Sequence, residues 1–166
     1  MELLLVRHAI AFERDPRRWR DDGERPLSPR GIARARKAAT GLKRLVARPT
    51  RLLSSPLLRT RQTAAVLTQY AGWPRAQNAS LLAPGTPPEE LLARLARERG
   101  PRIALVGHEP DLSELLAACL GASAAGAFAF RKMGVALVRF RGPVHAGRGQ
   151  LLWLLPPRLL RAVSPG

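Results

Sequence analysis

The chain has 166 residues, of which 46% are hydrophobic, so it is long enough to form one globular domain with a core of its own. A lone cysteine, Cys119, excludes a disulfide framework or a cysteine-based metal site within one chain, and its apolar surroundings predict a buried side chain. The 28 basic residues outnumber the 12 acidic ones and give a formal charge of +16, while aromatic residues, at 5%, are too few for a surface that stacks nucleic-acid bases.

Short apolar runs alternate with capped helical segments along most of the chain, and further apolar runs follow. In chain order the predicted elements are a strand at residues 3–6, a loop at 12–27, a helix at 29–46, a strand at 51–54, a helix at 56–72, a helix at 87–99, a strand at 103–106, a helix at 110–121, and strands at 128–130, 135–140 and 151–155. Ser28-Pro29 and Ser55-Pro56 are typical of an N-cap followed by Pro at the first helical position, and Gly72 is typical of a C-cap.

The alternation of strand and helix predicts a three-layer α/β/α sandwich with a mainly parallel central sheet, and the late hairpins predict an antiparallel edge. Residues 1–156 are expected to form a single domain, and residues 157–166 a loosely held tail. The apolar run before Arg7 is too short for a signal peptide, and nothing later approaches the length of a membrane span, so we expect a cytoplasmic protein without a membrane partner. A monomer is the default expectation for so small a domain.

The excess of positive charge has two interpretations. One is genomic bias, because nearly all basic residues are Arg and the chain is rich in Ala, Leu, Pro and Gly. The other is a partner rich in phosphate or carboxylate groups. The scattered positions of the Arg residues favour genomic bias. A basic nucleic-acid-binding module stays as an alternative, and it predicts salt-dependent binding that does not need His8.

Two His and two Arg follow the carboxyl ends of predicted parallel strands. Arg7 and His8 end the first strand, Arg59 follows the second, and His108 follows the strand at 103–106. Because ligands of open α/β sheets bind beyond these strand ends, we expect the four side chains in one crevice, beside the N-termini of two helices. Forked Arg donors match the oxygens of phosphate, so the site is expected to hold a tetrahedral anion.

Four segments carry short motifs in order: Leu5–Ala9, Arg25–Gly31, Ser54–Ala64 and Val106–Pro110. Together they resemble the signature blocks of the histidine phosphatase superfamily, which implies a phosphoglycerate mutase-like fold. The short chain and the stretch Phe130–Val135 are most similar to the SixA-like phosphohistidine phosphatases of that superfamily.

The resemblance implies that His8 attacks the phosphoryl group and forms a covalent phosphohistidine, which water then hydrolyses. Arg7, Arg59 and a protonated His108 are expected to bind the phosphoryl oxygens and to neutralise their charge in the transition state. No metal or other cofactor is implied. The neighbouring cations are expected to lower the pKa of His8 and keep it nucleophilic. His145 lies outside every motif and is expected to be a surface residue.

The general acid is the open question, because larger relatives carry a Glu that protonates an alkoxide leaving group. No acid immediately follows the strand-like Leu81-Leu82, and Glu89 and Glu90 more naturally occupy the first turn of a helix. Glu109 is a candidate acid, although we favour its interpretation as a neighbour of a helix N-cap.

A site without an acid suits phosphohistidine, because imidazole leaves more readily than an alkoxide. We therefore predict a phosphatase for phosphohistidine on a protein. A phosphatase for a small phosphorylated metabolite is the alternative, with Glu109 or an acid from the loop at 12–24 completing its site. A phosphate-binding protein without turnover is a third, weaker possibility.

Overall fold

The central strands consist of apolar residues because both faces of the sheet are covered. In the computed structural model, which describes residues 1–164, Leu3–Val6 and Ile103–Val106 are fully buried. Alternate side chains enter two cores: Leu4 and Val6 pack on one side of the sheet, and Leu3 and Leu5 on the other. The strands are β1 (Glu2–Arg7), β2 (Arg51–Ser54), β3 (Ala76–Asn78), β4 (Arg102–Gly107), β5 (Val135–Phe140) and β6 (Gly149–Leu155).

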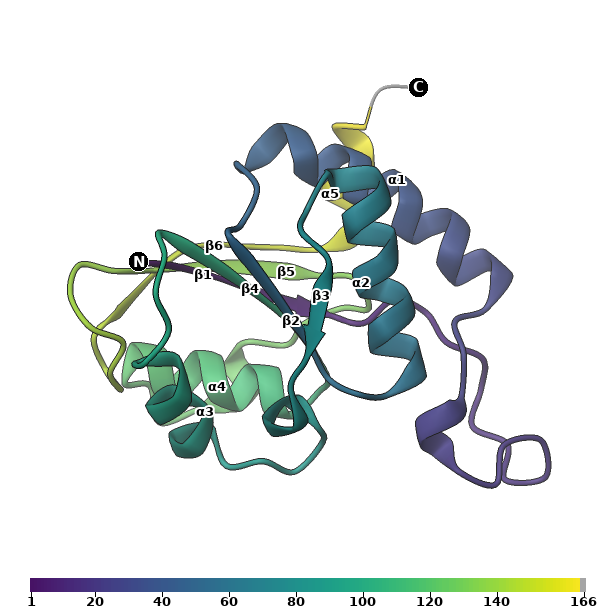
Figure 1. Cartoon of the computed structure of the whole chain (residues 1–166), viewed down its shortest axis with the longest axis horizontal. Helices are drawn as coiled ribbons and strands as arrows, with labels where there is room; N and C mark the ends of the chain where they lie inside the picture. Colours follow the sequence, from purple (N-terminus) through teal and green to yellow (C-terminus); the bar gives the residue numbers. More distant parts are fainter. Residues whose placement is uncertain (165–166) are drawn as a thin grey trace.

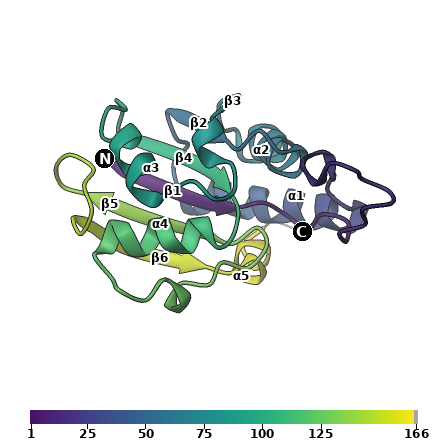
Figure 2. The same ribbon diagram turned by 90° about the horizontal axis from the view of Figure 1, so that it is seen from below.

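The six strands form one sheet in the order β3-β2-β4-β1-β5-β6. The first four are parallel to one another, whereas β5 is antiparallel to both β1 and β6. This arrangement confirms the predicted mainly parallel sheet with an antiparallel edge. It also brings the carboxyl ends of β1, β2 and β4 side by side at one end of the sheet (Figures 1 and 2).

Helices cover both faces of the sheet and complete the predicted three layers (Figures 1 and 2). One face carries α1 (Pro29–Leu45), α2 (Leu58–Ala71) and α5 (Pro157–Ala162), and the other carries α3 (Pro88–Leu95) and α4 (Asp111–Leu120). Ser28 caps α1 as predicted, because its hydroxyl accepts a hydrogen bond from the backbone N–H of Gly31 at 3.0 Å. Gly72 ends α2 in the left-handed conformation, also as predicted.

The prediction that Ser55 caps α2 was wrong. The N-cap of α2 is Leu57, without a side-chain hydrogen bond, and the hydroxyl of Ser55 contacts His108 instead. The prediction of a strand at 128–130 was also wrong, because no described strand includes these residues. Phe130 is apolar because it packs in a core, and burial alone does not require strand pairing. Strand β3 was missed, because its exposed residues show no apolar pattern.

The segment after Pro156, which we expected to be loosely held, instead begins with helix α5. Leu160 of this helix is fully buried against the core on the α1 side of the sheet, and that burial holds the segment in place. Within residues 1–164, no helix combines the length and the apolar character needed to cross a bilayer. The boundary of the domain at residue 156, the cytoplasmic location and the monomeric state stay predictions.

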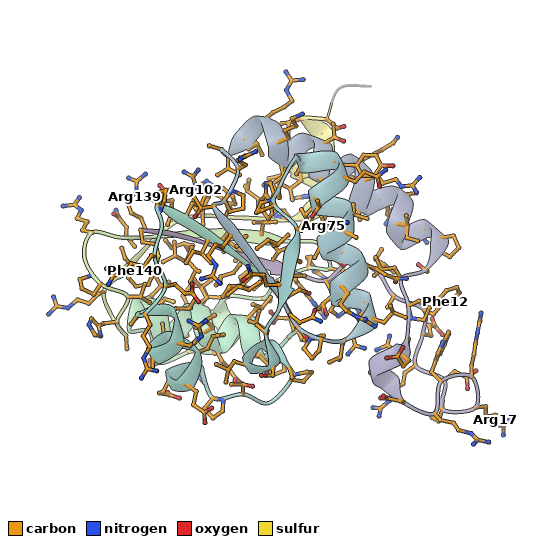
Figure 3. All side chains as sticks on the ribbon, in the orientation of Figure 1. Phe12, Arg17, Arg75, Arg102, Arg139 and Phe140 are labelled. Carbon is orange, nitrogen blue, oxygen red and sulfur yellow. The ribbon has the colours of Figure 1, made fainter. Side chains whose placement is uncertain are left out.

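The loop that follows β1 extends away from the body of the molecule, and Arg17 lies at its far end (Figures 1 and 3). Ala11 and Leu27 pair at the base of the loop in an isolated antiparallel bridge. The loop returns through a short 3-10 helix, η1 (Asp22–Glu24), which contacts α2. The return places Asp22 beside the carboxyl end of the sheet, where the predicted catalytic residues also lie.

Candidate active site

His8 lies directly after β1 and is buried. Its Nδ1 lies 2.7 Å from the backbone oxygen of Ala9. Because a carbonyl oxygen only accepts hydrogen bonds, Nδ1 must carry the proton and donate it, which leaves a lone pair on Nε2. Ala9 is held in turn by Thr63 of α2, whose Oγ1 accepts a hydrogen bond from the backbone N–H of Ala9 at 3.0 Å. The local fold therefore selects the tautomer in which Nε2 is a nucleophile.

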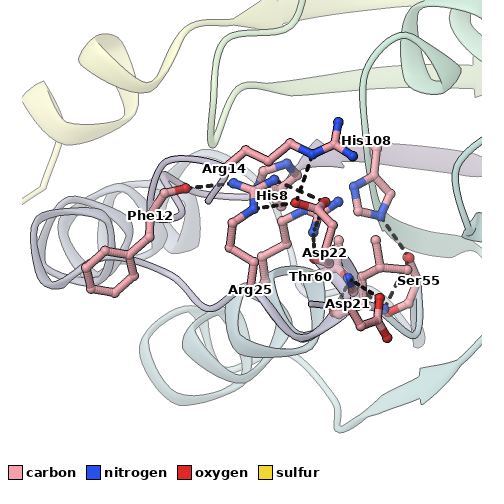
Figure 4. A network of polar contacts seen from close by, with 12 residues as sticks. His8, Phe12, Arg14, Asp21, Asp22, Arg25, Ser55, Thr60 and His108 are labelled. Atoms are coloured by element: carbon pink, nitrogen blue, oxygen red, sulfur yellow. Dashed lines mark hydrogen bonds and ion pairs between the residues drawn. The ribbon is translucent and has the colours of Figure 1, made fainter. Parts of the chain in front are cut away.

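His108 follows β4 and is also buried, with its ring centroid 5.3 Å from that of His8. Its Nε2 lies 2.8 Å from the hydroxyl of Ser55, which follows β2. The backbone N–H of His8 also donates to Gly107 at 3.0 Å. Strand pairing and these contacts bring three strand ends together, as the sequence predicted (Figure 4).

Arg59, in the first turn of α2, is buried and directed to the carbonyl oxygen of Asp22, which accepts from its Nη1 at 2.8 Å. The same Nη1 lies 3.2 Å from the carboxylate of Asp22. Arg25 donates to both oxygens of this carboxylate, at 2.8 and 3.3 Å (Figure 4). Asp22 thus positions two Arg side chains, and the Nε of Arg59 is buried without a partner among the described residues. A bound anion would supply that partner.

Arg7 is the last residue of β1, and its Nη1 donates to the backbone oxygen of Phe130 at 2.5 Å. Its Nε is likewise buried without a partner in the described part of the chain. Arg7 pairs in the register of β1 and β4 with Gly107, which precedes His108, and the charges of Arg7 and Arg59 both lower the pKa of His108. The structure therefore brings all four predicted residues together at the carboxyl end of the parallel strands.

Lys132 is a further cation at the site that sequence reasoning did not assign. Its pKa is lowered by burial first and then by the charges of Arg7, Arg25 and Arg59. The turn that carries it is fixed to the catalytic strand, because Met133 donates its backbone N–H to Arg7 and the N–H of Arg7 bonds Gly134, both at 3.1 Å. The position of Lys132 within the family-like stretch Phe130–Val135 was the available signal.

Burial and the surrounding cations keep both histidines neutral in the unliganded site. Burial first, and then the charge of Lys132, lower the pKa of His8 to about 2, as we expected of the nucleophile. Burial and the charge of Arg59 lower the pKa of His108 to about 4, which favours its neutral form at neutral pH; the protonated His108 that we expected in the transition state stays a prediction. A phosphate dianion would oppose these cations and raise the pKa of His108 on binding.

The two candidate acids differ in their surroundings. Hydrogen bonding and charge from Arg25 lower the pKa of Asp22, so this carboxylate stays ionised. Burial instead raises the pKa of Glu109. Oε2 of Glu109 accepts a hydrogen bond from the Ser113 hydroxyl at 2.5 Å, and Oε1 is buried without a partner among the described residues. Glu109 does not cap α4, whose N-cap is Pro110 without a side-chain contact.

The predictions for His145 and Cys119 concern residues outside the candidate active site. His145 is exposed in the turn between β5 and β6, and Cys119 is fully buried in α4, both as expected. Within residues 1–164, no group of three His, Cys, Asp or Glu side chains is arranged to hold a metal ion.

A sequence profile of the Histidine phosphatase superfamily (branch 1) matches residues 3–82. An uncharacterised protein of Picosynechococcus sp. is 41% identical over 117 residues, which are 69% of this chain and 70% of that protein. The structure is similar to that of the protein histidine phosphatase SixA complexed with tungstate, with a TM-score of 0.84 and 24% identity over 96% of this chain and 99% of that one. It is also similar to the alpha-ribazole phosphatase from Shigella flexneri, with a TM-score of 0.74 and 17% identity over 95% and 97% of the chains.

Proposed function

Since the chain belongs to the histidine phosphatase superfamily and is a phosphatase, we propose that it hydrolyses phosphohistidine on a protein through a covalent phosphohistidine on His8. The lone pair of His8 Nε2 attacks phosphorus, and the bond from phosphorus to the substrate imidazole breaks. The electron pair of that bond stays on the substrate nitrogen, and the ring leaves as neutral imidazole because its other nitrogen carries a proton. Water then attacks the phosphorylated His8, which releases inorganic phosphate and restores the neutral ring. The hydrogen bond from Nδ1 to Ala9 and the low pKa of His8 support this role for Nε2.

We assign Arg7, Arg59 and His108 to the phosphoryl oxygens. The unpartnered Nε atoms of the two Arg side chains are donors that a bound phosphoryl group would use. We add Lys132 to this set, since it shares its surroundings with Arg7 and Arg59. These cations would stabilise negative charge on the equatorial oxygens in the transition state, where charge-assisted hydrogen bonds act in a site that excludes water.

The observation that carries the choice of substrate is the state of Asp22. It is the carboxylate that bonds Arg59, and Arg25 keeps it ionised, so it has no proton to give to a leaving group. An alkoxide needs such a proton. A phosphohistidine ring instead takes its proton from solvent on the free nitrogen, as imidazole does with a pKa of about 6.5, and leaves as a neutral ring without a proton from the enzyme. A phosphoryl group on nitrogen therefore suits this site better than one on an alkyl oxygen.

Glu109 supports a second candidate function, the hydrolysis of a small phosphate ester. Burial raises its pKa, against the lowering effects of the Ser113 hydrogen bond and the Arg7 charge, and its Oε1 lacks a partner among the described residues. A carboxyl group with a raised pKa is better able to hold and deliver a proton than an ordinary one. The alpha-ribazole phosphatase of similar fold is consistent with such a substrate.

One experiment tests both functions. Phosphate release is measured from a histidine-phosphorylated protein, p-nitrophenyl phosphate and a sugar phosphate, with the wild type, His8→Ala and Glu109→Gln. We expect rapid release from phosphohistidine, slow release from the sugar phosphate, and a loss of at least about 10⁴-fold in His8→Ala. Glu109→Gln is expected to change the turnover of phosphohistidine by less than about threefold, because no proton from Glu109 is needed.

Efficient turnover of the sugar phosphate would contradict the choice of substrate. A loss of about 10²-fold or more in Glu109→Gln with the sugar phosphate, but not with p-nitrophenyl phosphate, would identify Glu109 as the acid, because p-nitrophenolate departs without protonation. Full activity of His8→Ala with every substrate would overturn the mechanism itself.

A further inference from the structure

The helices on the two faces of the sheet differ in charge. Helix α1 contains six basic residues, α2 and α5 contain two each, and these three helices contain no acidic residue. Helices α3 and α4 together contain four acidic residues and one basic residue. The positive charge therefore belongs mainly to one layer of the sandwich, and we call α1, α2 and α5 the basic layer.

A cavity of about 530 Å³ lies between the basic layer and the turn that carries Lys132. Its apolar lining includes Ala9, Ile10, Ala35 and Met133. Five cationic side chains also line it, and we call the cavity the basic pocket: Arg34, Arg131, Lys132, Arg158 and Arg161. None of its lining residues is acidic or aromatic.

Within residues 1–164, no carboxylate neutralises the cations of the basic pocket. Among the described residues none of the five forms an ion pair, whereas Arg25, Arg59 and Arg102 each have a carboxylate partner. Five like charges around one cavity repel one another, and an anion from outside would relieve that repulsion. The pocket is therefore suited to an anionic ligand.

The basic pocket adjoins the catalytic residues. Lys132 lines the pocket and also lowers the pKa of His8, and Ala9 of the pocket accepts the hydrogen bond from His8 Nδ1. The turn from Arg131 to Gly134 is closed by a backbone hydrogen bond of 2.6 Å, with Met133 in the left-handed region at a φ of 66°. This conformation is costly for a side chain other than glycine, and it presents Lys132 between the pocket and the site.

We propose that the basic pocket binds an acidic side chain of the substrate protein while its phosphohistidine lies at His8. This inference rests on the proposed function and names the surroundings that the phosphohistidine must have. An Asp or Glu side chain has a short apolar stem, which the Ala and Met surface would accommodate, and a carboxylate that Arg34 or Arg158 would bind. A nucleic acid fits less well, because the pocket offers no ring on which a base would stack.

The first test measures binding without catalysis. A fluorescently labelled, unphosphorylated peptide rich in Asp and Glu is titrated with the wild type, with the double variant Arg34→Glu/Arg158→Glu, and with a control. Arg34 and Arg158 are exposed, so their replacement should leave the fold intact. We expect the double variant to weaken binding by roughly tenfold or more, because two attractive contacts become repulsive.

The control variant is Arg141→Glu/Arg148→Glu, which makes the same change in net charge. Both residues are exposed and lie in the turn between β5 and β6. Because β5 is antiparallel to β1, this turn lies at the opposite end of the strands from His8. We expect the control to weaken peptide binding by less than about twofold, since long-range charge effects are screened at physiological salt.

The second test compares two histidine-phosphorylated peptides, one with Asp and Glu beside the phosphohistidine and one with Asn and Gln. We expect the wild type to prefer the acidic peptide in kcat/KM and the Arg34→Glu/Arg158→Glu variant to lose that preference. If neither peptide is hydrolysed but the acidic peptide still binds through the pocket, the proposed function fails and the pocket assignment stands. Equal weakening by both double variants, or tighter binding of a single-stranded oligonucleotide than of the acidic peptide, would overturn the inference.

Discussion

The basic layer and the layer of α3 and α4 cover opposite faces of the same sheet, with apolar residues on their inner sides. Their outer sides differ, because the basic layer has no carboxylate to offset its ten positive charges. A general excess of Arg codons would add positive charge to both layers, but it does not explain why the carboxylates gather on one. Composition alone favoured genomic bias, whereas the arrangement in space supports our proposal that part of the charge binds the substrate protein.

The residues that we propose as catalytic follow the carboxyl ends of the strands, between the two layers of helices. The basic layer contributes Arg59, while α4 is preceded by His108 and by Glu109. The cations that we assign to the phosphoryl group come from β1, α2 and the turn before β5, and Asp22 positions two Arg side chains from the projecting loop. We therefore expect a substitution at the site to lower turnover, and a substitution in the packing of a layer to lower the free energy of unfolding.

Among the substitutions that test the difference between the layers, the largest effect is expected from Arg59→Ala, which removes the cation that the basic layer supplies to the site. The loss of a charged donor to the transition state should lower kcat by about 10²–10³-fold. Steady-state turnover of a histidine-phosphorylated protein measures this effect. Arg61→Ala is the matched control: Arg61 is exposed, with its nearest carboxylate, that of Glu24, 4.0 Å away, so its removal should change kcat by less than about twofold. Equal effects of the two variants would remove the distinction between Arg59 and the rest of its layer.

The next effect concerns the pH dependence of stability. The pKa values of His8 and His108 in the folded protein, about 2 and about 4, lie below the value of about 6.5 expected in the unfolded chain. The unfolded state therefore binds more protons below pH 6.5, and stability decreases as pH falls through that value. Each histidine should lower the free energy of unfolding by about 2 kcal/mol between pH 7 and pH 5.

Urea unfolding at pH 7 and pH 5 tests this dependence, and the His108→Asn variant is the comparison. The variant should lose roughly half of the decrease, because it retains His8 alone of the pair. An unchanged decrease in the variant would show that His108 is not held neutral between the two layers.

A smaller effect is expected from Gly41→Ala, which tests how α5 joins the basic layer. A Cβ at Gly41 would lie 1.8 Å from the backbone oxygen of Leu160, so α5 would have to move away from α1. The strain should exceed the gain in helix propensity and destabilise the protein by about 1–3 kcal/mol. Thermal unfolding measures the change, and Gly126→Ala, where an added Cβ meets no atom within 4 Å, is the control. A more stable Gly41→Ala variant would contradict the close packing of α5.

Most of the fold was predictable from local signals. Buried strands read as continuous apolar runs, and Ser28 and Gly72 marked helix ends as caps do. Strand β3 was not predicted, because an exposed edge strand has no apolar pattern. The strand predicted around Phe130 was wrong, because core packing favours apolar residues as much as strand pairing does. Helix α5 was missed because its docking depends on Leu160 fitting beside Gly41, a contact between distant residues.

The candidate site was predictable in part. His8, Arg7, Arg59 and His108 were identified because each follows a strand end within a recognisable motif, and parallel strands bring such ends together. Asp22 and Lys132 were not assigned, since each lies in a loop whose path the chain order does not reveal. The lowered pKa of His108 could not be predicted from the sequence, because it depends on how deeply the folded chain buries the ring.

The sequence by itself determined the class of fold, the superfamily and the four residues proposed to bind and transfer phosphate, because these depend on local periodicity and on motifs at strand ends. Only the tertiary structure decided that Asp22 is ionised, that His8 presents Nε2, and that five cations without an ion pair among residues 1–164 surround a pocket beside the site. The physical reason is that pKa values and tautomers depend on burial and on the distances between charges, which arise only when distant segments pack together.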